Sequence, residues 1–249
     1  MIQEWKTPGG SYPRLYKQML AENHLLIAGC TGSGKSVLEN GLIYTSLYDS
    51  PLQARYIFID PKMNELIDYI DLPHTLAYAD KPKTIIAALQ YAIQLMEIRQ
   101  AENQRKRRKM YDGSIIYVVI DELQDLMTTN KRECFPILQR IAQVGRSSKI
   151  KLICCTQSPI SKIIPTELKC NFSARIGLKT ISRQDSKNIL DMPGCEKLPE
   201  PIIEGKAYGY YRHNGLIELY QIPWVEESEH RRIIEYWMQH RKPKIRLFA

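Results

Sequence analysis

The stretch "HLLIAGCTGSGKSV", residues 24–37, decides how the rest of the chain can fold. Four apolar residues run into a glycine-rich turn, and a Lys-Ser pair follows that turn. Residues 29–36 match the pattern G-x-x-x-x-G-K-[ST] without a mismatch. In this pattern the backbone N–H groups of the loop and the first turn of the next helix surround phosphate oxygens. The stretch therefore predicts a buried strand, a phosphate-binding loop and a helix over residues 35–48.

The phosphate-binding loop predicts a nucleotide site with ATP and Mg²⁺ as its ligands. Lys35 is expected to neutralise the β- and γ-phosphates, and the Ser36 hydroxyl is expected to hold the magnesium ion. The predicted nucleotide-binding residues are Gly29, Thr31, Gly32, Ser33, Gly34, Lys35, Ser36 and Val37.

A second signal is "IIYVVIDEL", residues 115–123, in which an apolar strand ends in Asp121 and Glu122. Ligands of parallel sheets bind at the carboxyl ends of the strands. Asp121 is expected to support Mg²⁺, and Glu122 to orient and deprotonate the attacking water. Acids often end strands, as Asp60 does in "YIFID", but the acid doublet distinguishes residues 121 and 122. Gln157, at the tip of "LICCTQ", is a candidate for sensing the γ-phosphate, although glutamine is common at strand ends.

Apolar strands alternate with helices along the chain, which predicts an α/β fold with a mainly parallel sheet covered on both faces. Alternation around Asn214-Gly215 predicts a hairpin over residues 207–222. The expected strands are residues 24–29, 54–60, 114–122, 150–157 and 173–180. The expected helices are residues 35–48, 83–111 and 134–148, with a terminal amphipathic helix at 226–242.

Composition limits the class of protein. The 249 residues are 44% hydrophobic and 25% charged, values that suit a full α/β core. No apolar run approaches the roughly 20 residues of a membrane-spanning helix, and no signal peptide begins the chain, so we expect a cytoplasmic protein without direct membrane insertion. The six cysteines form no CxxC pair, which favours reduced thiols over a zinc site. The net charge of +8 permits a polyanionic partner.

Six segments in order resemble the motor domain of the FtsK/SpoIIIE family of DNA translocases. The resemblance extends from about residue 23 to about residue 210. Its narrow motifs are "DPK-x-x-EL", a following "PH", and "DS-x-x-ILD". The segments are "HLLIAGCTGSGKSV", "YIFIDPKMNEL", "LPHTL", "VVIDELQDLM", "RIAQVGRSSKIKLICCTQSP" and "SARIGLKTISRQDSKNILD".

The resemblance implies a RecA-like P-loop NTPase fold, a ring of six subunits and ATP-driven movement along double-stranded DNA. In it Lys35, Ser36, Asp121 and Glu122 keep the roles given above, and Gln157 becomes the sensor. Arg146, in "AQVGRSS", matches the arginine that reaches into a neighbouring subunit's nucleotide site. Without the resemblance, we favour the interpretation of Arg146 as a surface arginine near a helix end.

Three basic residues after Gln157 are candidates for contact with DNA. Lys169, Arg183 and Lys187 match positions where the family carries cationic channel residues, although a solvated lysine looks the same in sequence. Contact of this kind with DNA phosphates is blind to base sequence and sensitive to salt. The basic run at 105–109 is compatible with a DNA-binding patch, but we favour the solvated end of the long helix.

The domain organisation predicted from these patterns is a lead-in at residues 1–22, the ATPase domain at 23–222, and an amphipathic helix with a basic tail at 223–249. Large members of the family add membrane helices and a DNA-reading winged helix, and neither is found here. The sequence thus favours a compact, motor-only member, such as a DNA-transfer or coupling ATPase of a mobile genetic element. Its expected partners are a relaxase or a secretion channel, which could recruit it to the membrane.

Two other functions stay open at this stage. A type VII protein-secretion ATPase shares these motifs but binds a protein substrate, and such ATPases usually carry tandem domains and membrane helices. A nucleotide-dependent assembly scaffold would not hydrolyse ATP, and the presence of Glu122 and Arg146 argues against it.

Overall fold

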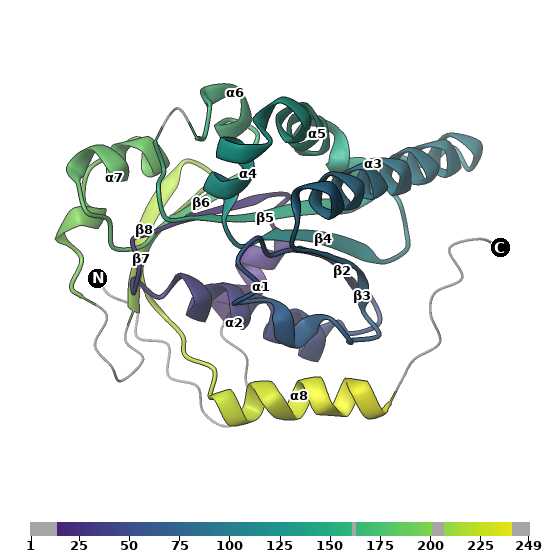
Figure 1. Cartoon of the computed structure of the whole chain (residues 1–249), viewed down its shortest axis with the longest axis horizontal. Coiled ribbons are helices and arrows are strands. Elements are labelled where there is room, and N and C mark those ends of the chain that lie inside the picture. Colours follow the sequence, from purple (N-terminus) through teal and green to yellow (C-terminus); the bar gives the residue numbers. More distant parts are fainter. Residues whose placement is uncertain (1–13, 161–162, 201–206, 241–249) are drawn as a thin grey trace.

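The computed structural model describes residues 14–160, 163–200 and 207–240. Its centre is an eight-stranded sheet with the order β3-β2-β4-β5-β1-β6-β7-β8 (Figure 1). Strands β1 to β6 are parallel, and β7 and β8 extend the sheet as an antiparallel hairpin, as predicted. The strands are β1 Leu25–Ala28, β2 Ala54–Ile59, β3 Thr75–Ala79, β4 Ile115–Ile120, β5 Ile150–Thr156, β6 Ala174–Gly177, β7 Ala207–His213 and β8 Leu216–Ile222.

Helices cover both faces of the sheet. Figure 1 shows α3, α4 and α5 above the sheet and α1 and α2 below it, with α8 along the outer side of α2. The α-helices are α1 Arg14–Ala21, α2 Lys35–Asp49, α3 Pro82–Arg105, α4 Leu123–Thr129, α5 Lys131–Val144, α6 Thr166–Lys169, α7 Arg183–Leu190 and α8 Glu227–Gln239. The 3₁₀ helices are η1 Ile67–Tyr69, η2 Gly145–Ser148 and η3 Cys195–Lys197.

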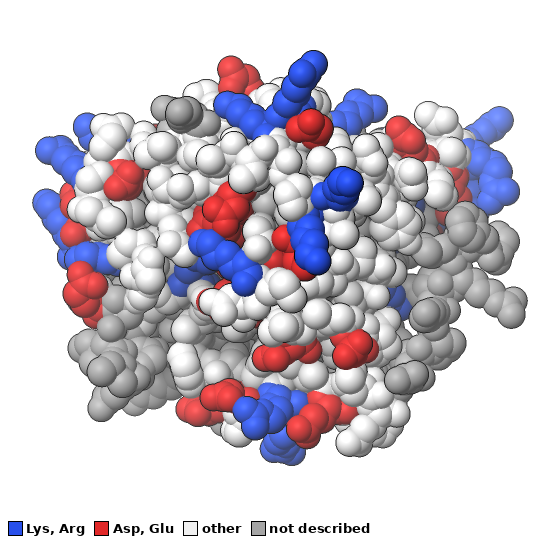
Figure 2. Space-filling model, viewed as in Figure 1, with Lys and Arg blue, Asp and Glu red and all other residues white. Residues whose placement is uncertain are grey.

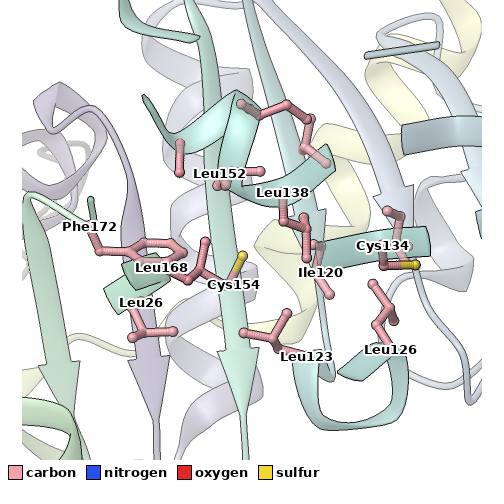
Figure 3. Close-up of a cluster of buried hydrophobic side chains, with 14 of the residues drawn as sticks. Leu26, Ile120, Leu123, Leu126, Cys134, Leu138, Leu152, Cys154, Leu168 and Phe172 are labelled. Atoms are coloured by element: carbon pink, nitrogen blue, oxygen red, sulfur yellow. The ribbon is translucent and has the colours of Figure 1, made fainter. Parts of the chain in front are cut away.

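Two apolar cores lie on the two faces of the sheet. In the upper core, side chains of the central strands meet those of the covering helices, as Figure 3 shows for Leu26, Ile120 and Leu152. These strands are buried on both faces, which explains why they read as continuous apolar runs rather than alternating ones. The sheet is therefore a rigid platform, and its loops carry the polar chemistry.

The helix that follows the phosphate-binding loop is held from both ends of the chain. The Tyr16 hydroxyl of α1 donates a 2.6 Å hydrogen bond to the Pro223 carbonyl, and its ring packs against Gly41 of α2. On the other side, the Trp237 indole of α8 donates to the Leu47 carbonyl of α2 at 3.2 Å. Helices α1 and α8, which flank the ATPase domain in the sequence, therefore pack against it. Residues 1–13 and the predicted basic tail at 241–249 lie outside the described residues.

The structure departs from the predicted elements at strand β3, at the end of α3, and at the helices α1, α4, α6 and α7, which were not expected. Strand β3 was not expected, because "TLAYA" is a short edge strand with mostly half-buried side chains and lacks a long apolar run. The long helix α3 ends at Arg105 and not at residue 111, so the interpretation of the basic run as a helix end is wrong beyond Arg105. The chain turns there because Arg107 has φ 50° and Arg108 folds back to pair with Glu102 at 3.0 Å.

Candidate functional site

The candidate nucleotide site lies at the edge of the sheet where the parallel strands end, which we call the carboxyl edge. Strand β5 separates β1 from β4, so the loops after these three strands are neighbours. The Gly29 N–H donates to the Thr156 carbonyl at 3.2 Å, and the Cys30 N–H donates to the Lys179 carbonyl at 2.8 Å. These bonds fasten the phosphate-binding loop to the ends of β5 and β6.

Two glycines shape the loop. Gly32 has φ 76° and Gly34 has φ 93°, both in the left-handed region that favours glycine. A Cβ atom at Gly34 would lie 2.5 Å from the Cβ of Ala207, whereas one at Gly32 would meet nothing within 4 Å. The loop then enters α2 directly, so the free N–H groups of that helix face the same space. This arrangement fits a phosphate group, as predicted for residues 29–37.

Lys35 is already engaged. Its ammonium pairs with the Asp121 carboxylate at 2.8 Å, and the two side chains are 8% and 4% exposed. Burial alone would lower the pKa of the Lys35 ammonium, but the acidic groups around it, Asp121 among them, outweigh burial and raise that pKa. The lysine is therefore fully charged, and a bound phosphate would compete with Asp121 for it.

Glu122 is a buried acid whose carboxylate is held in place by hydrogen bonds. It follows β4, caps α4 and is only 1% exposed. One carboxylate oxygen, Oε1, accepts hydrogen bonds from the backbone N–H groups of Gln124 at 3.3 Å and Gln157 at 3.2 Å. The other oxygen, Oε2, faces the Lys62 ammonium at 3.7 Å. The carboxylate thus has a fixed orientation and one oxygen without a hydrogen bond from the backbone.

Gln157 joins the loop to the second acid. Its side-chain Oε1 accepts a 3.0 Å hydrogen bond from the Thr31 hydroxyl, while its backbone N–H binds Glu122. A glutamine that spans the loop and the acid lies where a γ-phosphate sensor is expected. Lys35 thus binds Asp121, and the Gln157 backbone binds Glu122, so residues from three different strand ends meet at the carboxyl edge.

The oxygen atoms present suit a magnesium ion. Ser36 stands in the first turn of α2, next to Lys35, and the Lys35 ammonium pairs with Asp121 directly after β4. Hydroxyl and carboxylate oxygens are hard ligands of the kind Mg²⁺ prefers. Asp121 pairs with Lys35 in this structure, so a metal ion at Asp121 requires that the lysine leave it for a phosphate.

Sequence reasoning missed Glu39. It lies one turn after Lys35 in α2, is 1% exposed, and neither carboxyl oxygen has a hydrogen-bond partner among the described residues. Burial first, and the Asp121 carboxylate second, raise the pKa of Glu39 to about 8. Burial therefore favours the neutral form of this carboxyl group. Its spacing of four from Lys35, on one helix face, was the only available signal.

Arg146 lies away from the convergent site of its own chain. It is exposed in η2, just before β5 begins at Ile150, at the opposite or amino edge of the sheet. Strand β5 has seven residues, and such a strand spans roughly 20 Å. No salt bridge engages Arg146 within the described part of the chain. Arg146 therefore lies far from the candidate nucleotide site of its own chain.

The predicted DNA contacts divide into two kinds. Arg183 and Lys187 are exposed and lie one turn apart on α7. Lys169 is instead engaged: its ammonium binds the Asp191 carboxylate at 2.8 Å and the Asn188 carbonyl at 3.0 Å. On the face of the molecule seen in Figure 2, basic side chains are spread among acidic ones. Several basic side chains gather at the far end of α3, where the basic run lies.

Residues 11–116 of the chain match the FtsK/SpoIIIE family. The DNA translocase FtsK of Helicobacter pylori strain J99 is 38% identical over 232 residues, which cover 86% of this chain and 27% of that protein. DNA translocase FtsK of Caldanaerobacter subterraneus subsp. tengcongensis is 40% identical over 187 residues, 70% of this chain and 26% of that protein. The chain belongs to the FtsK/SpoIIIE family. It spans about a quarter of the length of these relatives.

Solved structures confirm the fold of this FtsK/SpoIIIE member. The pCW3 conjugation coupling protein TcpA, in a monomer form with ATPγS, has a TM-score of 0.76 and 22% identity, covering 90% of this chain and 66% of that one. The cytoplasmic domain of the type VII secretion ATPase EccC of Thermomonospora curvata has a TM-score of 0.76 and 20% identity, covering 91% of this chain and 29% of that one. Within the described residues, no helix combines the length and apolarity needed to cross a membrane.

Proposed function

We propose that this chain is an ATPase motor that moves double-stranded DNA. The observation that carries the proposal is the convergence of Lys35, Asp121, Glu122 and Gln157 at the carboxyl edge of a chain of the FtsK/SpoIIIE family. A phosphate-binding loop alone would suit any nucleotide-binding protein. The buried, oriented Glu122 adds the group that hydrolysis by water requires.

The chemistry follows from the groups present. Lys35 exchanges Asp121 for the β- and γ-phosphates, and backbone N–H groups of the loop hold the remaining phosphate oxygens. Glu122 accepts a proton from a water molecule that attacks the γ-phosphorus, and the bond to the β-γ bridging oxygen breaks. Ser36 and Asp121 would hold Mg²⁺, which would neutralise charge that develops on the phosphates. The side-chain amide N–H of Gln157 donates to the γ-phosphate and reports its loss, while its Oε1 accepts from the Thr31 hydroxyl.

The motor would work as a ring of copies, with six as the expected number. Arg146 lies at the edge of the sheet remote from its own site, and a neighbouring copy in a ring can supply it in trans. A guanidinium beside the γ-phosphate stabilises the transition state. Hydrolysis is then possible only at interfaces between copies, which couples the subunits.

Contact with DNA would use exposed cations. Arg183 and Lys187 present two positive charges on one face of α7, and the loop before α7 is tied to the phosphate-binding loop through the Lys179 carbonyl. Movement of the loop on hydrolysis can therefore shift α7. Phosphate contacts of this type do not select a base sequence.

The wider setting is also proposed. A cytoplasmic ATPase that transfers DNA for a mobile genetic element, and meets a relaxase or a secretion channel, is consistent with the fold shared with the coupling protein TcpA. The fold is shared equally with the secretion ATPase EccC, so fold alone does not separate a DNA substrate from a protein substrate. The higher identity, 38%, to a DNA translocase favours DNA.

The deciding experiment is the steady-state ATPase rate without DNA, with single-stranded DNA and with duplex DNA. It is done at about 50 mM and about 200 mM salt, because phosphate contacts weaken steeply over that range. We expect strong stimulation by duplex at low salt and its loss at high salt. ATP hydrolysis that neither DNA stimulates would favour a protein-secretion ATPase, and nucleotide binding without hydrolysis would favour an assembly scaffold.

A further inference from the structure

The motif D-P-K-x-x-E-L, residues 60–66, builds a compact loop after β2. The Asp60 side chain is fully buried, and its Oδ2 accepts the N–H groups of Asn64 and Leu66, both at 3.0 Å. The same oxygen accepts the Tyr78 hydroxyl at 3.2 Å. The spacing of the motif is thus explained, because the acid at its start binds the backbone at its end.

This loop presents Lys62 to the nucleotide site. The Met63 N–H donates to the Asp60 carbonyl at 3.1 Å, and Met63 has φ 53°, so the chain reverses directly after Lys62. The Lys62 ammonium lies 3.7 Å from Oε2 of Glu122 and 3.9 Å from Asp125. Within the described residues, Lys62 is the only basic side chain in an ion pair with Glu122.

The electrostatic need for such a cation is clear. The Glu122 side chain is 2% exposed, and a buried carboxylate without a countercharge is unfavourable. Its Oε1 is held by two backbone N–H groups, whereas its Oε2 has only Lys62 opposite. Lys62 is itself 44% exposed, so water can reach its ammonium without reaching the acid.

We infer that Lys62 is a positioning residue for the proposed hydrolysis: its ammonium balances the buried charge of Glu122 and fixes the carboxylate so that Oε2 can receive the proton of the attacking water. The inference rests on the proposed function of Glu122. Lys62 acts through that acid and has no place in binding the nucleotide.

The test is a double-mutant cycle on single-turnover ATP hydrolysis, with Lys62→Met, Glu122→Gln and the combined variant. Lys62→Met should lower the hydrolysis rate by about tenfold or more and leave the KM for ATP within about twofold. In the Glu122→Gln background the same change should have almost no further effect, because the charge it balances is gone. Lys62→Arg should restore most of the rate. Lys83→Met, which removes an exposed lysine from the start of α3, serves as the matched control.

Three results would overturn the inference: an unchanged rate in Lys62→Met, an equal fall in both backgrounds, or a rise in KM with no fall in rate. These differ from failure of the proposed function. If Glu122→Gln hydrolyses ATP as fast as the wild type, Glu122 is not the base, and the role of Lys62 falls with it. If Lys62→Met hydrolyses ATP at the wild-type rate while Glu122→Gln is slow, the proposed function stands and Lys62 has no part in it.

Discussion

Lys35 at the carboxyl edge of the parallel sheet and Arg146 at its amino edge differ in burial and in pairing. At the carboxyl edge, charged side chains are buried and paired with one another, as in the Lys35–Asp121 ion pair at 2.8 Å. At the amino edge, Arg146 is exposed and has no ion pair within the described residues, whereas Arg99 is buried there and donates to the Ser148 carbonyl at 2.9 Å. The difference therefore concerns Lys35 and Arg146 themselves, and not every charge at the two edges.

Two acids show a contrast of the opposite kind. Glu39, behind the carboxyl edge, is buried and has no ion pair among the described residues, and its pKa is raised to about 8. Asp191, near the amino edge, is 46% exposed and pairs with Lys169, Arg175 and Arg212. Burial raises the pKa of Asp191, but these cations outweigh burial and lower it to about 2. Environment, not residue type, sets the charge of each acid.

The largest effect should come from Lys35→Ala. The substitution removes the ammonium that is proposed to leave Asp121 and bind the phosphates, so ATP affinity should fall by about 100-fold or more. Titration of a fluorescent ATP analogue measures this, and thermal unfolding shows that the variant is folded. The matched control is Lys83→Ala, which should bind normally. Normal ATP turnover in Lys35→Ala would show that Lys35 does not belong to the nucleotide site.

Glu122→Gln should separate binding from hydrolysis. The amide keeps the shape but cannot accept the water proton, so turnover should fall by about 10²- to 10⁴-fold while ATP affinity changes only a few-fold. Single-turnover hydrolysis and equilibrium binding measure the two quantities. A wild-type rate in this variant would place the base elsewhere.

Mixing Arg146→Ala with Lys35→Ala tests whether the two edges meet between copies. Each variant alone should be nearly inactive. In a random equimolar ring, roughly a quarter of the interfaces combine an intact phosphate-binding loop with an intact arginine, and the rate should recover in proportion. An absence of recovery, in mixtures that mass spectrometry shows to be mixed rings, would exclude Arg146 as a residue supplied in trans.

The sequence predicted the carboxyl edge well because its signals are local. The pattern at residues 29–36 specifies the loop by itself, and parallel strands bring Asp121 and Gln157 to the same edge. The alternation at residues 207–222 and the Asn-Gly pair likewise predicted β7 and β8. In the structure Asn214 and Gly215 both adopt the positive φ that such a turn requires.

The remaining features depend on contacts distant in sequence. Nothing near Lys62 indicates that it meets Glu122, 60 residues away in the sequence. Glu39 reads as a solvated helix residue, since charged residues are rarely buried, and only packing against β4 and β5 shows otherwise. The early end of α3 depends on the left-handed Arg107 and the ion pairs of Arg108.

Glu39→Gln should change the pH dependence of stability. An acid with a folded-state pKa of about 8, against an ordinary value of 4.5, binds more protons folded than unfolded between these values. The free energy of unfolding of the wild type should therefore fall as pH rises from about 4.5 to about 8. The variant lacks this slope and should be more stable than the wild type at pH 8 or above, by on the order of 3 kcal/mol. Urea unfolding at pH 5, 7 and 9 measures the difference, and parallel curves would contradict the assignment.

Asp191→Asn should give the smallest effect, with the opposite sign. Asparagine tolerates the φ of 63° found at this position, so the change removes charge with little backbone strain. Because the folded-state pKa of Asp191 is depressed to about 2, its contribution is present above about pH 4 and is lost as pH falls towards 2. The pairs are partly exposed, so the loss at pH 7 should be about 1 kcal/mol or less. Urea unfolding at pH 7 and pH 2.5, in low and high salt, measures it. A large, salt-independent loss at both pH values would mean that Asp191 holds the amino edge together by packing, and the contrast between the two acids would then not be one of charge.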